Sequence, residues 1–439
     1  MFNQSLIAAG VALACTSFAY GQSRQVPAPR QVHPIVIHGG SVHTVSGETI
    51  RNGYVVFENG VITAVGEGAP PRVAGAQQVD ARGLHVYPGL ITTESLLGLV
   101  ETGSVQVTID HTEFGRITPE VRAAVAVNPD SDLLPVARSN GILTAFVTPR
   151  GGLISGRGSL MRLDGWTWED MSIEQDVGLL INWPRTEPID AWWMERSEED
   201  QRREIAEDLE SIERIFDEAL AYIQAKDNDP AQRTDLRYEG MRPALAGEKP
   251  VFVRASSMGQ IESAIAWGDR RGLKIIIIGG AEADRVIPLL KKHDVPVIIT
   301  GTHRLPSQRH TAHDQPFTLP LKLHEAGVRW CLASGAEPAH ERNLNHMAAT
   351  AAAYGLAPIE ALRGVTLYAA NIVGAGGMLG SIETGKAATL IITTGDPLEI
   401  VTDTLIAFID GRRIDLGNRQ SALYEKYKEK YRQLGLLAE

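Results

Sequence analysis

The stretch Gly83-Leu-His-Val-Tyr-Pro-Gly-Leu-Ile-Thr-Thr-Glu-Ser-Leu-Leu-Gly98 gives the strongest indication of the fold. An apolar strand runs through Pro88-Gly89, and polar residues ending in Glu94 follow at its carboxyl end. In α/β barrels, the carboxyl ends of the strands and the loops after them form the functional face. The stretch therefore predicts a first barrel strand with Glu94 at the barrel mouth.

The composition is that of an acidic globular protein. The chain has 439 residues, of which 44% are hydrophobic and 22% charged, and its formal net charge is −11. This length predicts two or three domains, or one large α/β barrel with an appendage. The negative charge argues against a nucleic-acid surface, so we expect no nucleic-acid partner.

Residues 1–21 predict a secretory signal peptide, although the usual basic residue near the start is missing. They form an uncharged segment whose apolar core is shorter than the ~20 residues of a membrane span, so we expect no stable span. Cleavage near Gly21 would leave a periplasmic or secreted protein. Its one remaining cysteine, Cys331, is expected to be buried and has no intrachain partner for a disulfide. Residues 22–33 predict a flexible leader.

Strand-forming segments lie near both ends of the chain. Residues 34–86 contain alternating strands and a hairpin that turns at Asn59-Gly60. Residues 380–418 contain a second hairpin that turns at Asp410-Gly411. We therefore expect two β segments on either side of a central region, residues 87–379.

The central region contains eight apolar strand segments. The first of them begins two residues before the region itself. Several are β-branched runs such as Ile275-Ile-Ile-Ile278, which are typical of strands buried on both faces. Helical patterns follow the later segments, and this alternation predicts a (β/α)8 TIM-like barrel. The strand segments are residues 85–91, 143–148, 159–163, 178–182, 251–254, 274–278, 296–300 and 328–334.

Taken together, these motifs resemble the amidohydrolase superfamily, in particular its imidazolonepropionase-like branch. In that family the opening stretch reads Pro-Gly-Leu-Ile-Asp-x-His-x-His. A later one reads Gly-Ser-Ile-Glu-x-Gly-Lys-x-Ala-Asp-Leu, which matches the segment from Gly380 except at Thr389. The resemblance covers roughly residues 35–413. It implies that both chain ends pair into a small β-sandwich beside the barrel, and that the barrel holds a catalytic zinc that hydrolyses carbon–nitrogen bonds.

This chain carries other residues at the positions of the family's metal ligands. Arginine is itself a cation and glycine has no side chain, so neither can bind a metal. We therefore expect no metal and no other cofactor, and we interpret the chain as a metal-free binding or partner protein, a pseudoenzyme. A hydrolase of carbon–nitrogen bonds, including cyclic amides, with a rebuilt active site remains the alternative. The substituted positions are Glu94, Leu96, Arg254, Gly279 and Gly335, and strand four ends at Asn182 without a lysine.

Glu94 and Arg254 suggest a replacement for the cation. Both stand on metal-ligand positions of the resembled family, so a carboxylate and a guanidinium would meet where the metal would lie. We therefore predict an ion pair between them. If the pair is buried, removing one partner should destabilise the protein by roughly 3–5 kcal/mol.

Other candidate residues follow the later strands. The pocket candidates are Glu94, Asn182, Arg254, Gly279, His303, Gly335 and Glu337, around an unknown small molecule at the barrel mouth. His310, His313 and Asp314 have a spacing that suits zinc, which makes them a weak alternative metal site. They stand in a loop pattern, where histidines are usually solvated.

Two long insertions, residues 98–140 and 187–241, follow the first and fourth strands, and we expect both to cover the mouth. The second predicts a helix capped by Ser197, with Trp192 and Trp193 before it. For these tryptophans, packing onto the barrel is favoured over stacking on a ligand.

Residues 419–439 predict a charged C-terminal helix. Leu423, Tyr427, Tyr431 and Leu434 share one stripe of this helix. The stripe could dock on the chain's own barrel or on a second subunit, and the sequence leaves both alternatives open. A homodimer is favoured, and pairing with a related subunit is the other option.

Overall fold

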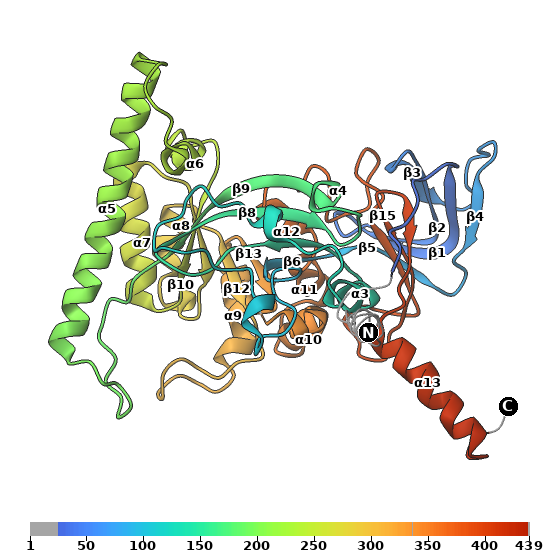
Figure 1. The fold of residues 1–439 in the computed structure, drawn as a ribbon. Coiled ribbons are helices and arrows are strands. Elements are labelled where there is room, and N and C mark those ends of the chain that lie inside the picture. Colours follow the sequence, from blue (N-terminus) through green and yellow to red (C-terminus); the bar gives the residue numbers. More distant parts are fainter. Residues whose placement is uncertain (1–24, 336, 438–439) are drawn as a thin grey trace, which may run out of the picture.

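The computed structural model describes residues 25–335 and 337–437. Its strands form two eight-stranded sheets. One sheet makes the central barrel, and the other is built from both ends of the chain (Figure 1). The segment assigned to a signal peptide, residues 1–21, and the start of the leader lie outside the described residues.

The barrel contains all eight strands that the sequence predicts. Neighbouring strands follow one another in chain order, and the last returns to the first. The Thr93 hydroxyl on the first strand donates to the Leu332 carbonyl on the last at 3.1 Å, so the barrel is nearly closed. The strands are β6 (Leu90–Ser95), β7 (Ile142–Val147), β8 (Ile154–Arg162), β9 (Ser172–Asn182), β10 (Val251–Ala255), β11 (Ile275–Gly279), β12 (Val297–Thr300) and β13 (Trp330–Ala333).

Strand direction departs from an all-parallel barrel at β8. This strand runs antiparallel to both β7 and β9, whereas β9 to β13 are parallel. Only residues 148–153 connect β7 to β8, and a parallel crossover needs a dozen residues or more. The short connection therefore forces a hairpin where strand–helix alternation was expected.

Helices cover the parallel half of the barrel. α7 (Met258–Arg271) begins at a capping box formed by Ser257 and Gln260, and Gly272 ends it in the left-handed conformation. Its buried side chains pack toward β10 and β11. The helices that follow are η2 (Ala283–Arg285), α8 (Ile287–Lys292), α9 (Gln315–Glu325), η3 (Pro338–Asn343), α10 (Leu344–Ala353), α11 (Pro358–Gly364) and α12 (Leu367–Ile372).

Shorter helices lie in the antiparallel half, and a last helix follows the second sheet. These are η1 (Gln106–Thr108), α2 (Ala123–Ala126) and α3 (Leu133–Ser139) before β7, α4 (Trp168–Met171) before β9, and α13 (Arg419–Gln433) near the carboxyl end. Within residues 25–335 and 337–437, no helix combines the length and apolarity that crossing a membrane requires.

The second sheet joins the two chain ends through one strand pair. β5 (His85–Pro88) runs antiparallel to β14 (Leu390–Thr393), and Gly89 marks the point where the chain passes into the barrel. A Cβ on Gly89 would lie 2.7 Å from the Leu143 side chain, so glycine permits this close passage. The other strands are β1 (Ile35–His43), β2 (Thr49–Glu58), β3 (Val61–Glu67), β4 (Gln77–Asp80), β15 (Thr404–Ile409) and β16 (Arg412–Ile414).

This sheet folds over on itself, which gives the sandwich that the resemblance implies. Phe57 on β2 packs edge-on against Phe408 on β15, with ring centroids 5.1 Å apart. The two strands are separated by three others in the order of the sheet. The Ile62 amide on the end strand β3 also donates at 2.9 Å to the Lys386 carbonyl, which stands just before β14.

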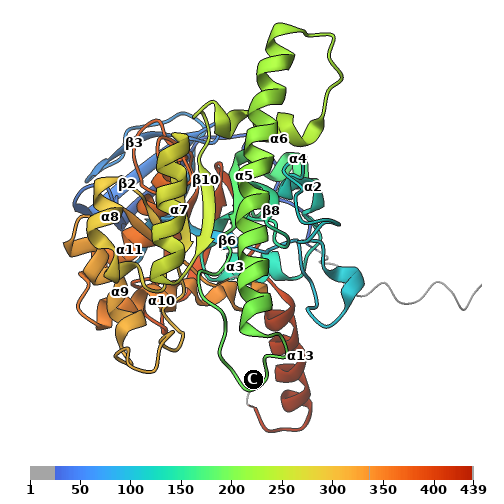
Figure 2. The same cartoon turned by 90° about the vertical axis from the view of Figure 1, so that its left-hand side faces the viewer.

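The second insertion lies along the side of the barrel. Its long helix α5 (Glu198–Asn228) begins at Ser197, whose hydroxyl accepts from the Asp200 amide, as the sequence predicts. Phe216 on α5 packs edge-on against Trp267 on α7, with ring centroids 4.9 Å apart, and the two helices stand side by side in Figure 2. The expectation that this insertion covers the mouth is therefore wrong for α5 and for α6 (Leu236–Leu245), which packs against it.

The two tryptophans of this insertion were expected to pack onto the barrel, and the structure differs. The side chains of Trp192 and Trp193 are 97% and 56% exposed, so they do not pack onto the barrel. In contrast, the first insertion reaches the mouth, because the Arg150 amide after β7 donates to the His111 carbonyl at 2.6 Å.

A buried ion cluster fastens the barrel to the second sheet. Asp164 lies between two arginines: Arg138 Nη1 on α3 is 2.7 Å from its Oδ1, and Arg412 Nη1 on β16 is 3.1 Å from its Oδ2. The Ala28 amide also donates to Oδ2 at 3.1 Å. The Asp164 side chain is 4% exposed, so these contacts take the place of water.

We predict that Asp164→Asn lowers the unfolding free energy by about 3–5 kcal/mol, because it leaves two guanidinium groups together without their carboxylate. Urea unfolding measures the change. Asp80→Asn, at the solvent-exposed pair with Arg82, serves as the control and should leave stability unchanged. Equal stability of Asp164→Asn and the parent chain would contradict this role.

Candidate functional site

The candidate site is centred on Glu94 at the carboxyl end of β6. The pairing of β6 with β7 shifts register between Thr92 and Ser95, which marks a bulge. Glu94 adopts a φ of +56°, a left-handed conformation that is uncommon for residues other than glycine. Its side chain is only 3% exposed. The strained backbone therefore holds a buried carboxylate at the mouth.

Two arginines bind the same oxygen of Glu94. Arg254 Nε on β10 donates to Oε1 at 3.0 Å, and Arg150 Nη2 donates to Oε1 at 2.8 Å. The predicted ion pair between Glu94 and Arg254 is therefore present. Burial lowers the pKa of Arg254, and the nearby Arg150 lowers it further, while the charge of Glu94 acts in the opposite direction.

The Arg254 guanidinium is engaged on all sides. Besides Glu94, it donates through Nη1 to Asn182 Oδ1 at 3.1 Å and through Nη2 to the Pro149 carbonyl at 3.0 Å. The Asn182 amide then donates to the Gly152 carbonyl at 2.8 Å. This arginine network links β6, the loop after β7, β9 and β10.

The arginine network does not fit the zinc that the resemblance implies. A zinc site requires neutral imidazoles, thiolates or carboxylates converging on one point. Here two guanidinium groups surround one carboxylate, so the local charge repels a cation. Glu94 Oε2 is buried with no hydrogen-bond partner among the described residues.

The weak alternative metal site also does not form. In the described parts of the chain, no group of three or more His, Cys, Asp or Glu side chains is placed to hold a metal ion. His310 and His313 are exposed, and Asp314 immediately precedes the first turn of α9.

A second buried carboxyl group, Glu341 on η3, lies beside Glu94. It is fully buried, and the Thr92 hydroxyl donates to its Oε2 at 2.5 Å. Burial raises the pKa of Glu341 to about 7, the charge of Glu94 also raises it, and the hydroxyls of Thr92, Ser334 and Ser95 lower it. Glu341 therefore exchanges a proton near neutral pH.

Two of the predicted positions contribute only to packing. Leu96 is 5% exposed and belongs to the large hydrophobic cluster around the barrel. Gly279 is buried at the end of β11 with a φ of +107°, and a Cβ there would lie 2.5 Å from the Ser256 hydroxyl.

The remaining candidates lie outside the arginine network. His303 is exposed, and its Nε2 lies 2.7 Å from the Thr350 hydroxyl on α10. Gly335 is exposed with a φ of +99°. Glu337 is exposed and precedes η3, where its carbonyl accepts from the His340 amide. The structure thus brings together Glu94, Asn182 and Arg254 but not these three.

Sequence analysis missed Arg150 and Glu341. Arg150 had a usable signal, since Pro149-Arg150 directly follows the predicted strand 143–148 and places a basic side chain at the mouth. Glu341 had no such signal in the sequence, because it stands several residues after β13, on the short helix η3 that only the structure defines.

We predict that Glu94→Leu lowers the unfolding free energy by about 3–5 kcal/mol, because Arg150 and Arg254 would then face each other without a carboxylate. Adding Arg254→Leu should recover part of this loss, since an apolar pair replaces the buried charges. Urea unfolding tests both variants, with the exposed Arg270→Leu as a control. A Glu94→Leu variant as stable as its parent would contradict the arginine network's structural role.

Glu341 should make stability depend on pH. Because burial raises its pKa from about 4.5 to about 7, the folded chain holds this proton more tightly than the unfolded chain. The corresponding stability is fully present below about pH 4.5 and is lost as the pH rises through about 7. Glu341→Gln, which mimics the protonated group, should flatten the unfolding free energy across this range. Parallel pH profiles for both proteins would contradict the assignment.

Comparisons with known proteins agree with this architecture. Residues 273–415 match the model of the amidohydrolase family. A search of curated proteins gives no significant match. Among solved structures, an amidohydrolase from Thermotoga maritima MSB8 superposes with a TM-score of 0.76 at 22% identity, over 87% of this chain and 99% of that one.

Two further solved structures are similar at lower TM-scores. An adenosine deaminase from Xanthomonas campestris with bound zinc gives a TM-score of 0.52 at 18% identity, over 92% of this chain and all of its own. A Xaa-Pro dipeptidase with methionine in its active site gives 0.53 at 14% identity, over 87% of this chain and 100% of that one. The resemblance to the amidohydrolase superfamily is thus confirmed: the chain has the amidohydrolase fold, and its residues 273–415 carry the sequence pattern of that family.

Proposed function

We propose that this chain is a metal-free binding or partner protein built on the amidohydrolase fold. The observation that carries the proposal is the position of Arg254, whose guanidinium contacts Glu94 Oε1 at 3.0 Å at the barrel mouth. Metal-dependent hydrolysis requires a cation that lowers the pKa of bound water. A guanidinium has no vacant orbital to bind that water, so it cannot take over this role.

The arginine network also indicates what the mouth would bind. It combines two guanidinium groups with one carboxylate, and the Arg150 side chain remains 32% exposed. Burial, followed by the positive charges of Arg150 and Arg254, lowers the pKa of the nearby His111. A small molecule with a carboxylate or another anionic group suits this environment.

Export of the chain belongs to the same proposal. It rests on residues 1–21, whose uncharged apolar core and small residues match a signal peptide. A periplasmic or secreted binding protein is consistent with the absence of any disulfide requirement, since only Cys331 would remain after cleavage.

A hydrolase of carbon–nitrogen bonds with a rebuilt site is the second candidate, and Glu341 is the observation that favours it. General acid–base catalysis works best when the pKa of the group lies near the operating pH, and Glu341 has a pKa of about 7. The Ser334 hydroxyl beside it is buried and lowers the pKa of Glu341.

Metal analysis and an activity panel separate the two candidates. We expect purified protein to contain far less than one zinc per chain by plasma mass spectrometry, even after growth with added zinc. We also expect it to hydrolyse neither cyclic amides nor dipeptides. Native mass spectrometry should instead detect a bound small anion, which is lost in Arg150→Ala.

Two outcomes would contradict the binding-protein proposal. Stoichiometric zinc with turnover that a chelator abolishes would establish a metal hydrolase. Turnover that persists in the chelator but disappears in Glu341→Gln would establish the rebuilt site. The conservative Glu341→Asp variant serves as a control, because it keeps a titrating carboxyl group.

A further inference from the structure

The C-terminal helix α13 extends away from the body of the protein. It leaves the second sheet at one end of the molecule, opposite to α5 (Figure 1), and none of its residues is buried. A capping box at Asn418 and Ser421 fixes its start. Helices of about 15 residues are marginal in water without tertiary contacts, so a helix of this length is expected to pack against a partner.

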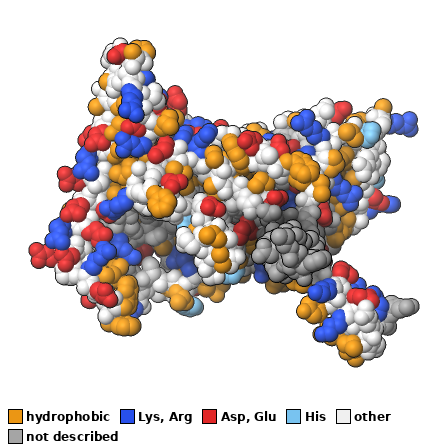
Figure 3. Space-filling view, in the orientation of Figure 1, with side chains coloured by type: hydrophobic (Ala, Val, Ile, Leu, Met, Phe, Trp, Pro, Cys, Tyr) orange, Lys and Arg blue, Asp and Glu red, His pale blue; other side chains and the backbone are white. Residues whose placement is uncertain are grey.

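One face of α13 is apolar and bordered by basic side chains. With 3.6 residues per turn, five large side chains fall on this face, which we call the tail face. They are between 42% and 63% exposed. Hydrophobic and basic side chains lie next to one another on this helix in Figure 3. The tail face comprises Leu423, Tyr424, Tyr427, Tyr431 and Leu434.

The charges of α13 are arranged around the tail face. The helix carries five basic and two acidic side chains. Lys426 and Lys430 border the tail face on one side and Lys428 on the other, whereas Glu425 and Glu429 lie at the back. Glu429 is paired there with Arg432. The surface that α13 offers is therefore an apolar strip between positive charges.

The opposite end of the molecule offers a complementary surface. Trp192 and Trp193 are 97% and 56% exposed in residues 187–196, which we call the tryptophan loop. A cavity of about 610 Å³ opens beside this loop, and Met194 and Ile189 are among its lining residues. Exposed tryptophans next to a groove are typical anchors of protein interfaces.

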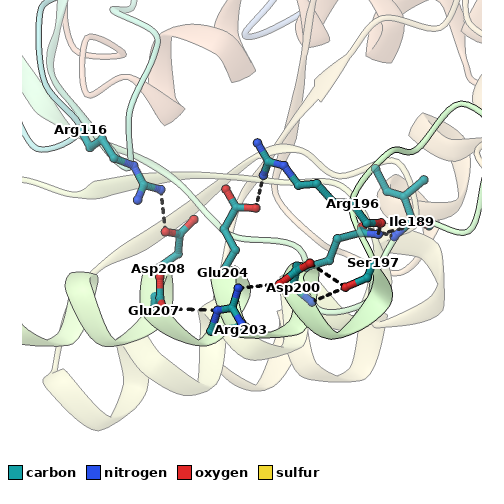
Figure 4. A network of polar contacts seen from close by, with 10 residues as sticks. Arg116, Ile189, Arg196, Ser197, Asp200, Arg203, Glu204, Glu207 and Asp208 are labelled. Carbon is teal, nitrogen blue, oxygen red and sulfur yellow. Dashed lines mark hydrogen bonds and ion pairs between the residues drawn. The ribbon is translucent and has the colours of Figure 1, made fainter.

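The tryptophan loop is negatively charged and held in place. Glu187, Asp190 and Glu195 stand in this loop, and Glu199 follows in the first turn of α5. None of the four is a member of the ion pairs formed here in the described part of the chain. The basic residues of the loop and of the first turns of α5 are paired, as Figure 4 shows for Arg196 with Glu204 and for Arg203 with Asp200. The Ile189 amide donates to Gln201 Oε1 at 2.8 Å, and this hydrogen bond ties the loop to α5.

We propose that the tail face of one copy binds the tryptophan loop of a second copy, and that the exchange is mutual. Because α13 and α5 lie at opposite ends of the molecule (Figure 1), the helix cannot reach its own loop. Two helices α13 pairing with each other would bring Lys426, Lys428 and Lys430 together. A mutual exchange instead joins opposite charges and closes as a two-fold dimer.

Charge reversal tests the proposal by sedimentation equilibrium of the full chain. We expect the parent chain to be a dimer at micromolar concentration. Reversal in the tail (Lys426→Glu, Lys428→Glu, Lys430→Glu) or in the loop (Glu187→Lys, Asp190→Lys, Glu195→Lys) should raise the dimer dissociation constant by about tenfold or more. An equimolar mixture of the two variants should form a heterodimer, because each reversed surface then meets its opposite.

Matched controls keep the result interpretable. Glu425→Gln with Glu429→Gln alters only the back of α13 and should leave the dimer unchanged. None of these side chains is buried, so circular dichroism and the melting temperature should match those of the parent chain. Trp192→Ala with Trp193→Ala should also give a monomer, which tests the apolar part of the contact separately from its charge.

Three results would overturn the proposal. The first is a parent chain that stays monomeric across the micromolar range. The second is a loop-reversed variant that dimerises like the parent, which would indicate that α13 pairs with itself. The third is a monomer that binds anionic phosphatidylserine vesicles through α13, which would assign the tail face to a lipid surface.

Discussion

The contact between Arg254 and Glu94 is the constraint on which the barrel mouth depends. A guanidinium buried at the end of β10 would be costly without a carboxylate, and a carboxylate buried in a strained turn of β6 would be costly without a guanidinium. Arg150, Asn182 and the Pro149 carbonyl complete the set of partners. These charged and polar contacts hold four segments of the barrel together: β6, the loop after β7, β9 and β10.

The rest of the architecture fixes the positions of Glu94 and Arg254 relative to each other. β6 continues directly from β5, so the second sheet fixes one end of the strand that carries Glu94. Asp164 ties the same sheet to α3. Displacement of either sheet would therefore move Glu94 relative to Arg254. This coupling gives the composite sheet a role in the geometry of a site that it does not touch.

Much of this architecture could be predicted from residue patterns, because burial on both faces leaves a clear mark on a strand. All eight barrel strands followed from such marks, and the start of α5 followed from its capping residue Ser197. The pairing of Glu94 with Arg254 came instead from the resemblance, because both stand on metal-ligand positions of that family. The direction of β8 did not, since an apolar run is the same in either direction and loop length decides it. The exposure of Trp192 and Trp193 was missed because aromatic burial is only a tendency. Glu341 was missed because its neighbours come together only in three dimensions.

The reversed strand β8 has a consequence for the order in which the barrel forms. Through β8, the strands β7, β8 and β9 make a meander whose contacts are local in sequence. The parallel strands from β9 onward each require an intervening helix before they pair. Low contact order favours rapid formation, so the meander is the part of the barrel best suited to form first. The later strands, with Arg254 at the end of β10, would then add to an edge that already carries Asn182.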